Sequence, residues 1–201
     1  MNEKTATTIF NTPIVSGIFY YLAKFIMRMV GWRVDGGLPD LPKFILIGAP
    51  HTSNWDFVLF LGVIFSLRAN VRFMGKAEIF RSPIGFFFRY CGGVPVDRSK
   101  STGLVDQMVQ ACRESDHFIL TIAPEGTRHQ VQEWKRGFYH IAKGAGIPIV
   151  MAIVDGKQKT VRVGQVFHPT EDMEADIKVI QGFFAGIVGI NPRRKYITLK
   201  S

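Results

Sequence analysis

The chain has 201 residues, of which 47% are hydrophobic and 20% charged, a composition that fits one globular domain and excludes a disordered chain. Its 25 Lys and Arg against 16 Asp and Glu give a net charge of +9, so we expect an anionic partner: a bilayer, a phosphorylated metabolite or nucleic acid. Because the sequence has neither an aromatic RNA-binding block nor zinc-ligand spacing, we expect no nucleic acid. Cys91 and Cys112 do not form a disulfide framework, which indicates a reducing compartment.

The first long element is an apolar, aromatic stretch at residues 14–32, which contains Lys24 and Arg28. A membrane-spanning helix needs about 20 mostly apolar residues, and two central cations make this stretch a poor candidate. Basic residues inside the apolar region also argue against a signal peptide. Two interpretations carry equal weight: an interfacial helix in the headgroup region of a bilayer, and an ordinary helix that packs on the core.

Strands and helices alternate along the rest of the chain, after a turn-rich connector at residues 35–43. Apolar or alternating runs predict strands, and runs with helical spacing predict helices. The expected strands are 44–49, 71–74, 93–96, 117–123, 147–154 and 160–167, and the expected helices are 53–67, 83–90, 101–114, 134–145 and 171–184. This order predicts an α/β fold with a mixed, mostly parallel sheet flanked by helices, in one domain (residues 35–201) that follows an N-terminal apolar segment (residues 1–34).

A polar motif follows the first buried strand directly. His51 comes after Pro50, and Asp56 lies five positions further along the chain. Open α/β sheets bind their ligands at such strand ends. Side chains five residues apart on one helix point about 140° away from each other, so contact requires His51 to precede the helix and Asp56 to lie in its first turn. Ser53 as the N-cap would allow this, but Ser53-x-x-Asp56 is also a capping-box pattern, and the local pattern supports catalysis and capping equally.

Four sequence blocks, in the same order, resemble those of the glycerolipid acyltransferases, the family that includes the 1-acylglycerol-3-phosphate acyltransferases. The blocks are His51-x4-Asp56, residues 75–78 (GKAE) followed by 93–98 (GVPVDR), residues 123–128 (APEGTR) and residues 147–150 (IPIV). Many members have Phe at the position of Ala123, and Arg136-Gly137 stands where a Lys-Gly pair is common. The order of four blocks is far more specific than the spacing of one His and one Asp.

This resemblance implies acyl transfer from a thioester to a hydroxyl, which requires a base for the hydroxyl proton. A histidine suits this task because imidazole titrates near neutrality, so His51 is the predicted base. Asp56 would orient the ring, as a carboxylate does in hydrolase triads. The acceptor's own hydroxyl replaces the serine of those triads, and the chain has no G-x-S-x-G elbow. Together with the other blocks, the pattern favours catalysis, and one carboxylate can also cap the helix.

The same resemblance assigns substrate binding to the second and third blocks. Arginine matches a phosphate bidentately, so Arg128 is the first candidate for the acceptor's phosphate, followed by Arg98 and Lys76. Each of these cations can instead pair with an acidic neighbour in its own block. Glu125 is expected to organise its turn rather than to transfer a proton, and Gly126 allows close backbone approach. The predicted substrate-binding residues are therefore Lys76, Arg98, Glu125, Gly126, Thr127 and Arg128.

The other histidines lack a second ligand at metal-like spacing, so we predict no metal, and no cofactor beyond acyl-CoA or acyl-carrier protein as co-substrate. Residues 86–88 (FFF) either line an acyl tunnel or belong to the core, and the core is the preferred interpretation. For Cys112, too, a core position is preferred over a nucleophile.

The expected function is transfer of a fatty acyl group to a lysophospholipid, with 1-acylglycerol-3-phosphate as the first choice of acceptor and phosphatidic acid, a phospholipid precursor, as product. The alternatives are the same chemistry on a lyso-ornithine lipid, glycerol-3-phosphate or a glycolipid, a thioesterase, and a catalytically silent protein that binds anionic lipid. Because members of the family act on membrane lipids, the resemblance favours the interfacial helix. We therefore expect peripheral or monotopic attachment to the cytoplasmic face of a membrane with anionic lipid.

Overall fold

The structure is a computed structural model that describes residues 8–96, 103–128, 131 and 133–192. A seven-stranded sheet forms its middle layer, in the order β1-β7-β6-β2-β5-β3-β4. Neighbouring strands are parallel except for β6 and β7, so the predicted mixed, mostly parallel sheet is confirmed. The strands are β1 (Arg33–Gly36), β2 (Lys43–Ala49), β3 (Arg72–Lys76), β4 (Gly93–Val96), β5 (Phe118–Ile122), β6 (Ile149–Asp155) and β7 (Thr160–Phe167).

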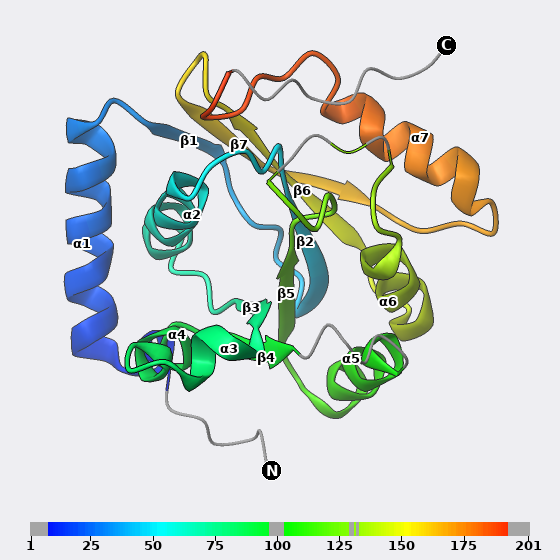
Figure 1. The fold of residues 1–201 in the computed structure, drawn as a ribbon, viewed down its shortest axis with the longest axis horizontal. Helices are drawn as coiled ribbons and strands as arrows, with labels where there is room; N and C mark the ends of the chain where they lie inside the picture. Colours follow the sequence, from blue (N-terminus) through cyan, green and yellow to red (C-terminus); the bar gives the residue numbers. More distant parts are fainter. Residues whose placement is uncertain (1–7, 97–102, 129–130, 132, 193–201) are drawn as a thin grey trace.

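Helices cover both faces of the sheet, with α1 and α2 on one face and α5, α6 and α7 on the other (Figure 1). The short helices α3 and α4 lie beside the β3–β4 edge, and a 3-10 helix, η2 (Ile9–Asn11), precedes α1. The α-helices are α1 (Pro13–Met29), α2 (Trp55–Ser66), α3 (Ala77–Arg81), α4 (Gly85–Tyr90), α5 (Leu104–Glu114), α6 (Gly137–Ala145) and α7 (Met173–Phe183).

The central strand β2 contributes to both cores. Successive side chains of a strand point to opposite faces, so Ile45 and Ile47 join the core shared with α5, α6 and α7. Phe44 and Leu46 join the core shared with α2. All four side chains are at most 5% exposed. This double burial explains the unbroken apolar run in the sequence, and it leaves the end of β2 as the point where the chain turns polar.

The sequence-based assignment differs from the structure at β1, at the short helix α3, which it did not predict, and at the start of α6. Part of the predicted connector forms β1, which pairs in parallel with β7, because backbone pairing overrides the turn-rich composition. α6 begins at Gly137 and not at Trp134, whose side chain is buried in the core. The neighbouring Lys135 donates its backbone N–H to the Pro124 carbonyl at 2.8 Å, so this stretch is bound to the turn after β5 before the helix begins.

The expectation that residues 86–88 belong to the core is also wrong in part. Phe86 is 75% exposed, and Phe87 is exposed as well. Only Phe88 packs inward, with its ring against Phe57 and Phe80. A six-residue helix such as α4 buries one face, and its aromatic run therefore divides between the core and the surface.

Helix α1 is apolar on two sides. Ala23 and Met27 are buried, and Met27 lies so close to α2 that a Cβ on Gly62 would be 2.9 Å from its Sδ. The side away from α2 exposes large apolar residues at helical spacing: Ile14, Ile18, Tyr21, Leu22, Phe25 and Met29. None of the helices in the described ranges is long and apolar enough to cross a membrane.

Candidate active site

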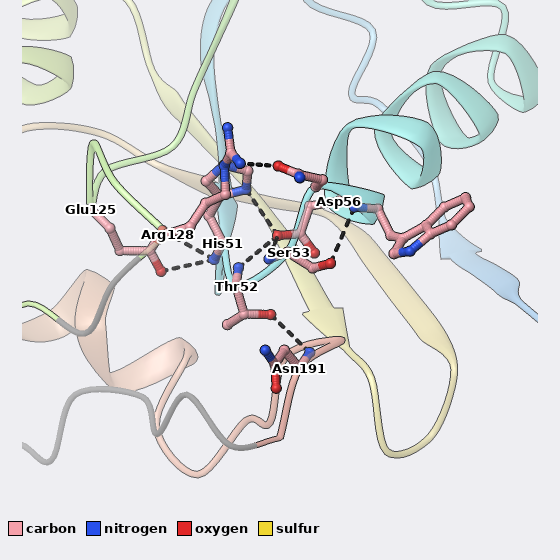
Figure 2. A network of polar contacts seen from close by, with 9 residues as sticks. His51, Thr52, Ser53, Asp56, Glu125, Arg128 and Asn191 are labelled. Carbon is pink, nitrogen blue, oxygen red and sulfur yellow. Dashed lines mark hydrogen bonds and ion pairs between the residues drawn. The ribbon is translucent and has the colours of Figure 1, made fainter.

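The first and third sequence blocks meet at one edge of the sheet. β2 and β5 are adjacent and parallel, so the loop after β2 and the turn after β5 leave the sheet at the same, carboxyl-terminal edge. The first carries His51 and the second carries residues 123–128. Figure 2 shows the two segments in contact, although His51 and Glu125 are 74 residues apart in the chain. Open α/β sheets bind ligands at this edge.

His51 and Asp56 are in direct contact. The Nδ1 atom of His51 lies 3.0 Å from Oδ2 of Asp56, and the His51 side chain is 28% exposed while that of Asp56 is buried. The same Oδ2 accepts the backbone N–H groups of Thr52 and Ser53, each at 2.6 Å. The carboxylate is thus held by two main-chain donors, and it fixes the ring with a proton on Nδ1 and a free electron pair on Nε2.

The start of α2 differs from the predicted capping arrangement. The N-cap is Asn54 and not Ser53, so Asp56 is the second helical residue. The Ser53 hydroxyl accepts the N–H of Trp55 at 3.2 Å. Asp56 still accepts backbone N–H groups that precede the helix, as the acidic residue of a capping box does. One carboxylate therefore serves the helix start and the histidine at once.

Glu125 lies inside the protein and binds the loop of residues 50–53, which we call the catalytic loop after the role predicted for His51. It is only 5% exposed, and both of its carboxylate oxygens lie 3.0 Å from the backbone nitrogen of His51. Burial raises the pKa of Glu125 to about 7, although the His51 N–H favours the charged form. Sequence reasoning gave Glu125 a role in organising its own turn, and the structure adds a bond to the loop that carries the histidine.

Arg128 lies at the mouth of this site. Its exposed guanidinium donates to the side-chain oxygen of Asn54, a residue for which the sequence suggested no role. Thr127 and Gly126 belong to the same turn, and Gly126 has a φ of +64°. A Cβ on Gly126 would lie 2.7 Å from Cδ of Lys135, so the lysine side chain runs directly over the turn. Lys135 is therefore a further cation beside the site that the motif pattern did not single out.

The other two predicted phosphate ligands are Lys76 and Arg98. Lys76 is exposed at the end of β3, next to β5 at the same edge of the sheet. Arg98 lies outside the described residues. Thr52 and Asn191 also form part of the site's polar network (Figure 2), and the sequence gave no signal for either of them.

Two relatives of this chain are named 1-acyl-sn-glycerol-3-phosphate acyltransferases. A 1-acyl-sn-glycerol-3-phosphate acyltransferase of Haemophilus influenzae is 24% identical over 161 residues, which cover 77% of this chain and 65% of that protein. One of Saccharomyces cerevisiae is 28% identical over 149 residues, 70% of this chain and 48% of that protein. This chain thus spans less than two thirds of the length of either relative.

The fold is also that of a solved structure. The crystal structure of the 1-acyl-sn-glycerophosphate acyltransferase from Thermotoga maritima matches with a TM-score of 0.60 at 19% identity, over 85% of this chain and 76% of that one. Residues 37–154 match the model of the family described as Acyltransferase, and they include His51, Asp56 and the turn after β5. With more than half of its length matched, the protein belongs to the acyltransferase family.

Proposed function

We propose that this protein transfers a fatty acyl group from acyl-CoA or acyl-carrier protein to the free hydroxyl of a lysophospholipid, with 1-acylglycerol-3-phosphate as the acceptor. The observation that carries the proposal is the 3.0 Å contact between His51 and a buried Asp56 at the edge of the sheet where ligands bind. The names of the two relatives support this acceptor.

The reaction follows from the orientation of the ring. Nε2 of His51 takes the proton of the acceptor hydroxyl while the hydroxyl oxygen attacks the thioester carbonyl carbon. Asp56 stabilises the imidazolium that forms, because it is bonded to Nδ1. The tetrahedral intermediate then expels the thiolate, which recovers the proton from Nε2. No acyl group is attached to the protein at any stage.

Arg128 is the proposed ligand of the acceptor's phosphate. Its guanidinium lies beside the catalytic loop, and its bond to Asn54 orients it there. A guanidinium binds a phosphate through two parallel hydrogen bonds. Phosphate held at this point would place a neighbouring hydroxyl group within reach of His51, and Lys76, Lys135 and Arg98 would add positive charge.

Replacing Arg128 by alanine should raise the KM for the phosphorylated acceptor with little change in kcat, since the bond is made in the ground state and the transition state alike. Loss of a charge-assisted pair corresponds to about 10–100-fold in KM. Initial rates against acceptor concentration measure this effect. Arg113→Ala, an exposed arginine on α5, is the matched control. An unchanged KM would remove Arg128 from the phosphate site.

The acceptor is tested with a panel of lyso-lipids, glycerol-3-phosphate and water alone, using labelled acyl-CoA and acyl-carrier protein. Product from 1-acylglycerol-3-phosphate supports the proposal. Product from another lyso-lipid keeps the chemistry and replaces the acceptor, whereas free fatty acid without an acceptor indicates a thioesterase.

We further propose peripheral attachment to a membrane through the exposed side of α1. This side presents Ile18 and Phe25, 59% and 62% exposed, and the helix carries Lys24 and Arg28 but no acidic residue. Apolar side chains flanked by cations suit the interface of a bilayer with anionic lipid. The exposed Phe86 of α4 adds a further apolar contact near the start of α1, where Tyr90 bonds to Thr12.

Changing Ile18 and Phe25 together to serine should weaken binding to vesicles of phosphatidylcholine and phosphatidylglycerol by at least about 10-fold, because burial of each apolar side chain contributes about 1.5–3 kcal/mol. Sedimentation with vesicles measures the binding. Surface substitution is a cleaner test than deleting α1, since deletion would uncover the side of α2 that packs on Met27. Val179→Ser on α7, an exposed valine on the other face of the sheet, is the control. Equal binding by both proteins would rule out this side of α1.

A further inference from the structure

We infer that residues 188–191, which we call the C-terminal strap, position the catalytic loop by binding Thr52. The strap follows α7 and lies outside residues 37–154, the part matched by the family. The catalytic meaning of this contact rests on the proposed function, whereas the contact itself does not.

The strap reaches the loop through a hydrogen bond to Thr52. This residue is 5% exposed, and its hydroxyl oxygen accepts the backbone N–H of Asn191 at 3.0 Å, across 139 residues of sequence (Figure 2). The backbone N–H of Thr52 donates to Oδ2 of Asp56 at 2.6 Å. A single residue therefore bonds to the strap on one side and to the carboxylate that orients His51 on the other.

The strap also packs on the loop without space for a side chain. Gly189 is buried, and a Cβ there would lie 2.6 Å from both Oγ1 and Cγ2 of Thr52 and 3.2 Å from Cγ of Pro50. The approach is closer than a methyl group tolerates, so only glycine lets the strap lie against Thr52 as it does. Any larger residue at 189 must displace the strap or the catalytic loop.

The other end of the strap is fixed to the sheet. Gly156, directly after β6, donates its N–H to the Val188 carbonyl at 2.7 Å. A Cβ on Gly156 would lie 2.3 Å from the carbonyl oxygen of Gly189, so this contact also depends on a glycine. β6 is the neighbour of β2 in the sheet. The strap therefore connects the end of β6 with the loop that leaves β2.

This arrangement makes Thr52 a positioning residue. The direction of the Asp56 carboxylate depends on the two N–H groups that hold it, and Thr52 supplies one of them. If the strap releases Thr52, this N–H moves and the contact between Asp56 and His51 loses its geometry. The chemical step should suffer, because catalysis depends on the orientation of its groups to within about 1 Å. Acceptor binding through Arg128 should stay unchanged.

Four variants test the positioning role of Thr52. Thr52→Val removes the hydroxyl at nearly constant volume, and Thr52→Ser keeps it. Gly189→Ala displaces the strap, and Gly182→Ala changes a glycine outside it. At Gly182 a Cβ meets no atom within 4 Å, so this change is the matched control. We expect kcat to fall about 10-fold in Thr52→Val and Gly189→Ala with the acceptor KM within about twofold. Thr52→Ser should recover most of the loss, and Gly182→Ala should behave as the wild type.

Hydrogen–deuterium exchange of the peptide that covers residues 50–56 gives a readout that needs no activity. Its amides should exchange faster in Thr52→Val and Gly189→Ala, while those of α5 stay unchanged. Wild-type exchange in both variants, or a Thr52→Ser protein as impaired as Thr52→Val, would overturn the inference. A wild-type protein without transferase activity would refute the proposed function, and the exchange result would still decide whether the strap holds the loop. If Thr52→Val does not fold, Gly189→Ala and Gly182→Ala carry the comparison.

Discussion

His51→Ala is expected to reduce kcat for acyl transfer to 1-acylglycerol-3-phosphate by about 10³-fold, the range that a positioned general base contributes. Without the imidazole, no group bonded to Asp56 takes the proton of the acceptor hydroxyl. The phosphate ligands remain, so the acceptor KM should change little. The measurement is the rate of formation of phosphatidic acid from labelled acyl-CoA or acyl-carrier protein by the purified protein.

The substitution should leave the fold intact. The group by which Glu125 holds His51 is the backbone N–H, which alanine retains, and the imidazole itself is partly exposed. Equal melting temperatures for the variant and the wild type check this point. His168→Ala, an exposed histidine after β7, is the matched control and should keep full activity. Turnover near the wild-type rate in His51→Ala would refute the assignment of the base.

The fold was predictable because its signals are local. The run at 44–49 is apolar on both sides, which is typical of a central parallel strand, and the alternation of strands and helices fixes the class. β1 escaped prediction because its four residues become a strand only through pairing with β7, which lies over a hundred positions later in the sequence. α6 begins late because Trp134 is drawn into the core, a tertiary contact without a local pattern.

The candidate site likewise has contacts that the sequence predicts and contacts that it does not. His51 and Asp56 are close in sequence, so their contact followed from a short loop before a helix. The partners that hold the loop are remote: Glu125 binds the N–H of His51, and Asn191 binds the hydroxyl of Thr52. Both bonds involve the main chain, which every residue has, and a sequence therefore carries no mark of them. The sequence therefore predicted the side chains of the site but not the main-chain hydrogen bonds that hold the loop.

Glu125→Ala is the second large effect we expect, with a fall in kcat of about 10²-fold. The change removes both oxygens that accept the N–H of His51 and leaves that part-buried donor without this partner. The loop is then free to shift, and the imidazole moves with its backbone. The acceptor KM should rise less than kcat falls, because the carboxylate points at the loop and not at the position assigned to phosphate. Steady-state rates for the variant and for Glu125→Gln measure the effect.

The glutamine variant separates the hydrogen bond from the charge. Its amide oxygen accepts the His51 N–H, so activity should lie well above that of Glu125→Ala; equal loss in both variants would show that the charge, not the bond, matters.

Stability gives the independent check. The pKa of Glu125 is raised from 4.5 to about 7 by burial, so between these values the folded protein retains a proton that the unfolded chain releases. The contribution of this group to stability is therefore complete below about pH 4.5, and the free energy of unfolding falls by about 3 kcal/mol as the pH rises from about 4.5 to about 7. Glu125→Gln has no proton to lose, and its free energy of unfolding, measured by urea titration from pH 5 to 8, should lack this decline. Parallel curves for the two proteins would mean that a group other than Glu125 causes the decline. A flat curve for the glutamine variant would mean that the buried carboxylate of Glu125, which holds the loop with His51, lowers the stability of the wild type near neutral pH.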